Sequence, residues 1–325
     1  MRAVTVARPG GVENLAISEV PDLEPGPGQL LVRNFATALN RADLLQRRGL
    51  YPPPAGESEI LGLEFAGEVA RTGADVEGFR TGDRVFGLLG GGGYAEQVVV
   101  DQRMAMPVPD HFSYDLAAAV PEVFFTAHEN LFTLGRLAPG ERVLIHAGAS
   151  GVGTAAIQLA RLRGAQVLAT AGSPEKLRVC RELGADRAIN YRDEDFASVV
   201  EQVTGNEGVD VILDLVGAPY WERNLRSLGP GGRLLVVGLL GGARVETDLG
   251  VVLRRRIQII GSALCGRSRE DKVAITGRFR REVLPLLERG EARPIIDRVF
   301  PIEEVEEAHR RMEQNLNCGK IVLRL

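Results

Sequence analysis

The sequence predicts an α/β protein in which a doubly wound sheet of six parallel strands is inserted into a second domain of short strands. Two patterns along the chain carry this prediction. Between about Pro139 and Ser262, apolar runs of strand length alternate with helix-like stretches, the order of a parallel sheet with helices on both faces. Before Pro121, short β segments are separated by Gly and Pro, which is typical of an antiparallel, barrel-like domain.

The individual elements follow from apolar periodicity and from start and stop signals. In the parallel sheet we expect strands at residues 142–146, 166–170, 187–189, 210–214, 232–238 and 257–261. The helices expected between them are residues 150–163, 174–183, 195–204, 219–227 and 247–255. In the first domain we expect strands at residues 1–6, 29–36, 67–71, 83–86 and 94–100. The chain then returns to that domain with a helix at 271–289, a strand at 295–300, a helix at 302–315 and a strand at 320–325.

Composition narrows the class of protein. A chain of 325 residues with 45% hydrophobic and 25% charged residues is long enough for two ordinary globular domains. A net charge of −4 argues against a nucleic-acid-binding surface spread over the whole protein. The three cysteines are far apart and form no Cys-x-x-Cys pair, which suits a reducing compartment. The N-terminus resembles a strand rather than a signal peptide and no apolar run reaches membrane-spanning length, so we expect a cytoplasmic protein without membrane or nucleic-acid partners.

The most informative motif is a glycine-rich turn between an apolar strand and an apolar-periodic helix. The turn reads Gly148-Ala149-Ser150-Gly151-Val152-Gly153. This arrangement presents backbone N–H groups and a helix N-terminus to a pyrophosphate, so we expect these residues to bind a dinucleotide. The spacing is Gly-x-x-Gly-x-Gly rather than the commoner Gly-x-Gly-x-x-Gly, and a turn that only packs a helix on a sheet is the alternative.

The end of the next strand indicates which dinucleotide binds. An NAD-specific site places Asp or Glu about twenty residues after the glycines, but this chain continues with Ala171-Gly172-Ser173-Pro174-Glu175-Lys176. Ser173 and Lys176 could each donate a charge-assisted hydrogen bond of about 1.5–3 kcal/mol to a 2′-phosphate. Two such bonds would favour NADPH over NADH by about two to four powers of ten. In the alternative reading, Ser173 only caps a helix and Lys176 is a solvated lysine.

With these motifs, the chain resembles the medium-chain dehydrogenase/reductase superfamily, in its zinc-free quinone oxidoreductase (zeta-crystallin) branch. The closest resemblance is to the stress-inducible NADPH quinone oxidoreductases. Beyond the glycine-rich turn, matching segments lie at residues 38–43, 49–54, 61–64, 92–96 and 319–322. One departure is Ser150, where the branch usually has Gly. The resemblance implies a GroES-like catalytic domain of residues 1–121 and 265–325, a Rossmann domain of residues 122–264, and a homodimer.

The resemblance also predicts that no zinc is bound. Zinc alcohol dehydrogenases of the superfamily hold a catalytic zinc with a Cys, a His-Glu pair and a second Cys. The corresponding positions here are Asn40, Leu63 before Glu64, and Thr126. A zinc site needs three or four converging N, S or O side chains, and Leu63 cannot be a ligand.

The implied activity is hydride transfer from NADPH to a quinone, an electrophile that needs little help from a metal. Reduction of α,β-unsaturated carbonyls or enoyl thioesters is the second possibility, because relatives on this scaffold perform it. A third is a non-catalytic NADPH-binding structural or RNA-binding protein, for which the basic clusters Arg47-Arg48 and Arg254-Arg255-Arg256 are the sequence support.

Candidate site residues come from the same resemblance. Tyr51, ahead of three prolines, is expected to contact the substrate, unless it only covers the proline turn. Asn40 is expected to touch the nicotinamide or substrate, unless it only caps a helix at residues 41–48. Neither is a convincing proton donor, which leaves water as the proton source. Further cofactor contacts are expected at Thr126, Tyr191, Gly238, Leu239 and Cys318.

The sixth strand of the parallel sheet, residues 257–261, is apolar and lies at the expected edge of the sheet. An unpaired apolar edge is an association hazard. We therefore expect it to pair with a second copy across a two-fold axis.

Overall fold

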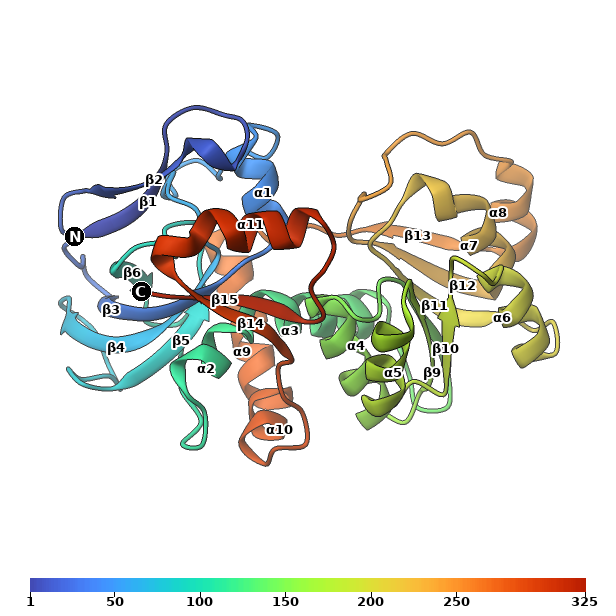
Figure 1. Cartoon of the computed structure of the whole chain (residues 1–325). Helices are drawn as coiled ribbons and strands as arrows, with labels where there is room; N and C mark the ends of the chain where they lie inside the picture. Colours follow the sequence, from blue (N-terminus) through green and yellow to red (C-terminus); the bar gives the residue numbers. More distant parts are fainter. The chain divides into compact units, whose positions relative to one another are not determined.

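The computed structural model describes all 325 residues, which form two compact units. Unit 1 comprises Met1–Phe125 and Leu264–Leu325, and unit 2 comprises Thr126–Ala263 (Figure 1). The chain thus begins in unit 1, builds unit 2 and ends in unit 1. No helix has the length and apolar character needed to cross a membrane.

Unit 2 contains a six-stranded, wholly parallel sheet with the order β10-β9-β8-β11-β12-β13. Its strands are β8 (Arg142–Ile145), β9 (Gln166–Ala171), β10 (Arg187–Asn190), β11 (Val209–Asp214), β12 (Leu228–Val236) and β13 (Gln258–Gly261). The strand order reverses at β8, directly before the glycine-rich turn, and ligands of such sheets bind at this kind of switch point. The predicted doubly wound fold is therefore confirmed.

Helices cover both faces of this sheet (Figure 1). They are α4 (Gly151–Leu162), α5 (Pro174–Glu182), α6 (Phe196–Thr204), α7 (Trp221–Ser227) and α8 (Leu249–Arg255). A cluster of buried apolar side chains from β8, β9, β11 and β12 packs against α6 and α7. The central strands β8, β9 and β11 are mostly buried on both sides, which explains why they carry mainly apolar residues, whereas the edge strand β13 is largely exposed.

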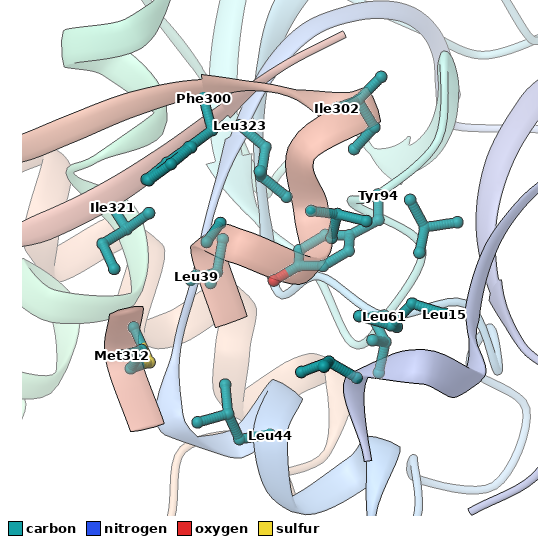
Figure 2. Close-up of a cluster of buried hydrophobic side chains, with 14 residues drawn as sticks. Leu15, Leu39, Leu44, Leu61, Tyr94, Phe300, Ile302, Met312, Ile321 and Leu323 are labelled. Atoms are coloured by element: carbon teal, nitrogen blue, oxygen red, sulfur yellow. The ribbon is translucent and has the colours of Figure 1, made fainter. Parts of the chain in front are cut away.

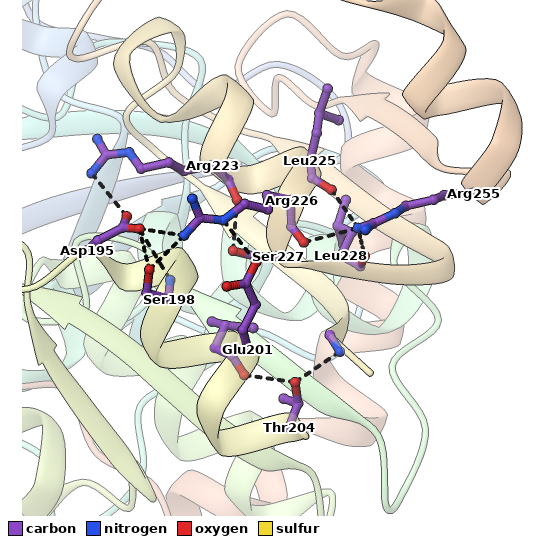
Figure 3. A network of polar contacts seen from close by, with 12 residues as sticks. Asp195, Ser198, Glu201, Thr204, Arg223, Leu225, Arg226, Ser227, Leu228 and Arg255 are labelled. Atoms are coloured by element: carbon purple, nitrogen blue, oxygen red, sulfur yellow. Dashed lines mark hydrogen bonds and ion pairs between the residues drawn. The ribbon is translucent and has the colours of Figure 1, made fainter. Parts of the chain in front are cut away.

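Charged side chains join α6, α7 and α8 (Figure 3). Arg226 in α7 forms ion pairs with Asp195 (2.5 Å) and Glu201 (3.0 Å) of the α6 segment. Arg255 in α8 donates to the carbonyl oxygens of Leu225, Arg226 and Leu228, so it satisfies the carbonyl groups at the end of α7. Within the basic cluster Arg254-Arg255-Arg256, Arg255 therefore has a structural role.

Unit 1 is built on a mainly antiparallel sheet with the order β14-β15-β3-β4-β5-β7, in which β6 pairs with β3. Its strands are β3 (Gln29–Ala38), β4 (Glu64–Thr72), β5 (Arg84–Leu88), β6 (Gln97–Asp101), β7 (Ala105–Pro107), β14 (Ile296–Pro301) and β15 (Lys320–Arg324). A separate hairpin pairs β1 (Arg2–Val6) with β2 (Leu15–Glu19). The C-terminal strand β15 pairs with β3, so both chain ends contribute to one sheet, as the predicted GroES-like domain requires.

A hydrophobic cluster of unit 1 joins these strands to α1 (Arg41–Arg47) and α11 (Val305–Glu313) (Figure 2). Leu39, Leu44, Ile321 and Leu323 contribute side chains that are at most 3% exposed. The cluster lies beside the ends of β3 and β15, where Asn40 and Lys320 are found. It fixes the backbone that carries those two polar residues.

The helix expected at residues 271–289 is wrong as a single element. The chain forms α9 (Arg269–Glu282) and a separate α10 (Leu284–Glu288). Pro285 lies in the first turn of α10, and it has no N–H to donate to a carbonyl one turn earlier. A continuous helix cannot pass through this position, so the first helix ends at Glu282.

Three helical segments between residues 114 and 134 lie outside the helices expected from the sequence. They are α2 (Tyr114–Ala118), α3 (Pro121–His128) and a π-helical stretch, Glu129–Leu134. α3 spans the point where unit 1 gives way to unit 2.

Candidate active site

The glycine-rich turn joins β8 to α4 at the switch point of the parallel sheet. Ser150 is the N-cap of α4, and its hydroxyl accepts a hydrogen bond from the Gly153 N–H at 3.0 Å. A Cβ on Gly153 would lie 2.3 Å from the carbonyl oxygen of Ala147, so only glycine fits there. A Cβ on Gly148 would lie 2.9 Å from the Sγ of Cys180, so this glycine lets α5 pack closely on the turn.

Backbone N–H groups at the start of α4 remain for a ligand. The Ser150 N–H donates to Ala147 (2.8 Å) and the Thr154 N–H donates to the Ser150 carbonyl (2.8 Å). With Gly153 bound by the Ser150 side chain, the N–H groups of Gly151 and Val152 have no partner within the helix. Together with the helix dipole, they make this end of α4 suitable for an anionic group.

Ser173 and Lys176 follow β9, and Tyr191 follows the adjacent strand β10. Ser173 caps α5 by accepting from the Lys176 N–H at 3.3 Å, as one of the two sequence readings predicts. Tyr191 follows β10, and its hydroxyl lies so close to Gly172 that a Cβ there would meet it at 2.4 Å. Ser173 and Tyr191 therefore lie close to the end of β9, and the stretch Ala171–Ser173 provides no carboxylate.

A buried polar network beneath the strand ends was missed by sequence reasoning. Asn224 in α7 donates its amide to Asp214 Oδ2 (3.0 Å), and its Oδ1 accepts from His146 Nε2 (2.7 Å). The other ring nitrogen of His146 pairs with the Thr170 hydroxyl at 3.0 Å. Burial lowers the pKa of His146 to about 4, so the imidazole is neutral and can accept from Thr170. The network joins the ends of β8, β9 and β11.

Asp214 also holds the loop that follows β11. Its Oδ1 accepts from the N–H groups of Val216 (2.7 Å) and Gly217 (3.1 Å). Gly238 and Leu239 follow β12, and a Cβ on Gly217 would lie 2.9 Å from Leu239 Cδ2. Leu239 itself is half exposed. These residues therefore lie at the carboxyl edge of the sheet, where sequence reasoning expected them.

Thr126 and Cys318 belong to different units. Thr126 is buried in α3, and its carbonyl oxygen accepts from the Asn130 amide at 2.8 Å. Cys318 is partly buried before β15, and its N–H donates to Asp297 at 3.0 Å. Neither contact identifies a cofactor, and their expected roles remain predictions.

In unit 1, Asn40 belongs to a buried cluster around the Lys320 ammonium. Lys320 donates to the Leu39 carbonyl (2.8 Å), to Asn40 Oδ1 (2.7 Å) and to Glu64 Oε1 (2.6 Å). The Asn40 amide in turn donates to Glu64 Oε1 at 2.8 Å. Lys320 and Glu64 are at most 3% exposed, so this is a desolvated and fully hydrogen-bonded ion pair. Asn40 is held between its two partners.

Two further carboxyl groups face this ion pair. Asp43 accepts from the Asn40 N–H at 2.7 Å, and Asn40 is the N-cap residue of α1, as the alternative reading predicts. Glu122 in α3 donates its backbone N–H to Glu64 Oε2 at 2.9 Å. Burial raises the pKa of Asp43 to about 7, and burial together with the nearby Glu64 charge raises the pKa of Glu122 to about 8.

Tyr51 lies in the loop after α1, and the Cys265 thiol is one of the groups that raise its pKa. Burial, followed by the effects of Cys265 and Glu122, raises the pKa of Tyr51 to about 12. The phenol is therefore protonated at neutral pH. Sequence reasoning missed Cys265 and Glu122, because both are far from Tyr51 along the chain.

Arg47 is not part of an exposed basic patch, as the cluster Arg47-Arg48 had implied. Its side chain is 1% exposed and donates to Gly10 O (3.1 Å) and to His309 Nδ1 (3.2 Å). His309 Nε2 lies 3.3 Å from the Tyr94 hydroxyl, which donates to Asp43 at 3.2 Å (Figure 2 shows Tyr94). Burial lowers the pKa of His309 to about 3, so the ring is neutral.

The residues at the expected zinc positions do not fit a zinc ion. Leu63 is a buried aliphatic side chain. The oxygens of Asn40 and Glu64 accept hydrogen bonds from the Lys320 ammonium, a cation that already neutralises Glu64. Nowhere in the chain do three or more His, Cys, Asp or Glu side chains gather as a metal site requires.

Comparison with known proteins agrees with this architecture. Residues 26–110 match the family of alcohol dehydrogenase GroES-like domains, and residues 151–276 match the zinc-binding dehydrogenases. The chain is 34% identical to a quinone oxidoreductase of Pseudomonas aeruginosa over 323 residues, 99% of each chain. The structure of Escherichia coli quinone oxidoreductase complexed with NADPH has a TM-score of 0.90 at 28% identity, covering 100% of both chains. The CurK enoyl reductase also has a TM-score of 0.90, at 30% identity, covering 99% of this chain and 98% of its own.

Proposed function

This chain belongs to the quinone oxidoreductases of the medium-chain dehydrogenase/reductase superfamily, and we propose that it transfers a hydride from NADPH to a quinone. It is an oxidoreductase of the pyridine-nucleotide-dependent class. The observation that carries the choice of cofactor is the segment after β9, where Ser173 caps α5 and the stretch Ala171–Ser173 provides no carboxylate.

The residues of unit 2 fit a dinucleotide. The N–H groups of Gly151 and Val152 would hold the diphosphate, because Gly153 leaves no side chain in the way. Ser173 and Lys176 would hold the 2′-phosphate of the adenosine ribose. When bound, the nicotinamide supplies the hydride, and the protein supplies orientation and a site from which water is excluded.

The residues of unit 1 serve the substrate. The raised pKa keeps the Tyr51 hydroxyl protonated, so it can donate a hydrogen bond to a quinone oxygen on which negative charge develops. Asn40 is immobilised by Lys320 and Glu64 and acts as a fixed polar group beside this position. No metal is needed, since a quinone is already a good electrophile.

Reduction of an enal or an enoyl thioester is the second candidate, favoured by the likeness to the CurK enoyl reductase. Steady-state oxidation of NADPH across a panel of small ortho- and para-quinones, enals and enoyl thioesters separates the two. We expect turnover with quinones and much slower turnover with the alkenes. The reverse order would replace the proposal with the second candidate, and metal analysis of the same sample tests the expectation that zinc is absent.

We also propose a homodimer that pairs β13 across a two-fold axis. β13 is the edge strand of the parallel sheet, and Ile259 on it is 44% exposed. Leu253 on α8, the helix that precedes β13, is 78% exposed. Sedimentation at micromolar concentration should give a dimer, and a monomer would contradict this assembly.

A further inference from the structure

We propose that Asn224 is a positioning residue for the coenzyme, because its buried side chain links the strand ends on which the dinucleotide would lie. This inference rests on the proposed function and adds to it a residue that acts through others, since Asn224 is 0% exposed. All the groups concerned belong to unit 2. Asn224 lies in α7, a helix to which the sequence assigned no part of the site.

The Asn224 side chain is held in one orientation by its two partners. Its amide nitrogen donates to Asp214 Oδ2 at 3.0 Å, and its oxygen accepts from His146 Nε2 at 2.7 Å. The reverse orientation would place the amide oxygen against the Asp214 carboxylate, so repulsion excludes it. Since His146 donates through Nε2, its Nδ1 accepts from the Thr170 hydroxyl at 3.0 Å. These four side chains form one polar network in which each hydrogen bond fixes the direction of the next.

Burial excludes a direct chemical role for this network. All four of its side chains are 0% exposed. The imidazole ring packs edge-on against the rings of Phe196 and Tyr220, with centroids 4.7 Å away in both cases. A hydroxyl beside an imidazole acts as a nucleophile in some enzymes, but no substrate can reach this one. A buried network whose groups are all paired instead makes the backbone around it rigid.

One end of the network holds the glycine-rich turn. His146 is the residue that follows β8, and its N–H donates to the Leu213 carbonyl at 3.0 Å. The Thr170 carbonyl accepts from the Gly148 N–H at 2.8 Å, so the residue that binds the imidazole also binds the first glycine of the turn. A shift of His146 or Thr170 would therefore move the turn proposed to bind the diphosphate.

The other end holds the loops that follow β11 and β12. Asp214 Oδ1 accepts from the N–H groups of Val216 (2.7 Å) and Gly217 (3.1 Å). The Asp214 carbonyl accepts from the N–H groups of Val237 (2.8 Å) and Gly238 (3.2 Å). Both loops lie at the carboxyl edge of the sheet, where dinucleotides bind. The amide on α7 therefore fixes the place of these loops relative to the glycine-rich turn.

The first test is calorimetric titration of Asn224→Leu with NADPH and with NADH. Leucine is similar in size but neither donates nor accepts, so Asp214 Oδ2 and the His146 Nε2–H lose their partner. We expect both coenzymes to bind about 10-fold or more weakly and by the same factor, because the network holds backbone facing the parts that they share. Unchanged affinities, or a loss confined to NADPH, would overturn the proposal.

Asn224→Asp separates hydrogen bonding from packing. Two adjacent buried carboxyl groups share a proton, so at pH 6 the introduced carboxyl can donate to Asp214 and accept from His146, as the amide does. His146 itself stays neutral at this pH, because burial and the nearby Arg223 charge hold its pKa at about 4. Affinities for both coenzymes should stay within about 3-fold of wild type. Affinities as low as those of Asn224→Leu would contradict a role for these hydrogen bonds.

A second position tests the network even if Asn224→Leu does not fold. Thr170→Val keeps the side-chain shape but leaves His146 Nδ1 without its donor, and we expect both coenzymes to bind about 3-fold more weakly. Thr276→Val is the matched control in α9, because its hydroxyl is also 0% exposed and donates to the Lys272 carbonyl at 2.8 Å. The control should bind both coenzymes as wild type does. Equal affinities in the two valine variants would contradict the positioning role.

Steady-state kinetics keep this inference distinct from the proposed function. At saturating NADPH, kcat for quinone reduction by Asn224→Leu should stay within about twofold of wild type, while the KM for NADPH rises with the dissociation constant. A fall in kcat at unchanged KM would overturn the positioning role. Wild-type protein that binds NADPH without turning over a quinone would refute the proposed function alone, because the binding tests of Asn224 need no quinone. Wild-type protein that binds neither coenzyme would refute both.

Discussion

At the end of β9, we propose that Ser173 faces the adenosine ribose of the bound coenzyme. Ser173 caps α5 and lies next to Lys176. Aspartate is as good an N-cap as serine, so Ser173→Asp keeps the helix start while placing a negative charge there. We predict that the KM for NADPH rises by about 10-fold or more, because one charge-assisted hydrogen bond is replaced by repulsion. The KM for NADH should change little.

The matched control is Ser113→Asp, which makes the same change at the N-cap of α2. Steady-state kinetics with both coenzymes should leave the control unchanged. Parallel increases in KM for NADPH and NADH in Ser173→Asp would show that this residue does not face the 2′-phosphate.

The Lys320–Glu64 pair is the most consequential buried contact of unit 1. Lys320→Met would leave Glu64 buried without its counter-charge, so we predict a loss of about 3–5 kcal/mol in the free energy of unfolding. Adding Glu64→Gln removes the uncompensated charge and should recover part of that loss. Urea denaturation of the single and double variants measures both values. A double variant no more stable than Lys320→Met would show that the uncompensated Glu64 charge does not cause the loss of stability.

Some of these residues could be predicted from sequence and others could not. The caps Ser150 and Ser173 were predictable, because a helix start depends on neighbours within four residues. Lys320 and Glu64 were not linked, because their contact is set by the pairing of β15 with β3 and of β3 with β4. For the same reason, a dipeptide such as Arg47-Arg48 gave no sign that Arg47 is buried.

At the scale of elements, the junction of β8 and α4 depends on close backbone packing. Gly153→Ala would place a Cβ 2.3 Å from the Ala147 carbonyl oxygen, so the start of α4 must shift. We predict at least about a 10-fold loss of NADPH affinity, equivalent to about 1.4 kcal/mol. Calorimetric titration measures it directly.

Gly277→Ala is the matched control, a glycine-to-alanine change inside α9. Its new Cβ would approach nothing closer than 3.8 Å, so binding should be unchanged. Stability should rise by about 0.5–1 kcal/mol, since alanine favours a helix over glycine. Equal NADPH affinities in the two variants would show that the turn does not hold the cofactor.

Most elements of unit 2 were predicted, because its central strands are largely apolar runs and helices such as α4 and α5 begin at clear N-cap residues. The break between α9 and α10 at Pro285, by contrast, was not predicted. Charged residues keep the helical pattern on both sides of the proline, so periodicity alone joined α9 to α10. The parallel pairing of β14 with β15 could not be predicted from the sequence either, because it depends on how α11 packs against both strands.

At the scale of the whole molecule, four buried groups shape how stability depends on pH. The folded chain raises the pKa of Asp43 to about 7 and of Glu122 to about 8, so it holds protons that the unfolded chain has lost. The free energy of unfolding therefore falls as the pH rises towards these values. His146 and His309 act oppositely, because burial lowers their pKa to about 4 and about 3, and their effect ends near pH 6.5.

We predict that stability falls between pH 6.5 and 8 and that Glu122→Gln reduces this slope. One group contributes at most about 1.4 kcal/mol per pH unit. Urea denaturation at several pH values measures the difference, with Glu59→Gln as the control. Identical slopes in wild type and Glu122→Gln would show that Glu122 does not change its protonation in this pH range.

We propose above all that the turn at Ser150 and the end of β9 bind NADPH for reduction of a quinone. Calorimetric titration of the purified protein with NADPH and then with NADH tests it most directly. We predict saturable binding of one NADPH per chain, with NADH bound more weakly by about two powers of ten or more. No measurable affinity for either reduced coenzyme would contradict both the proposed coenzyme site and the proposed function.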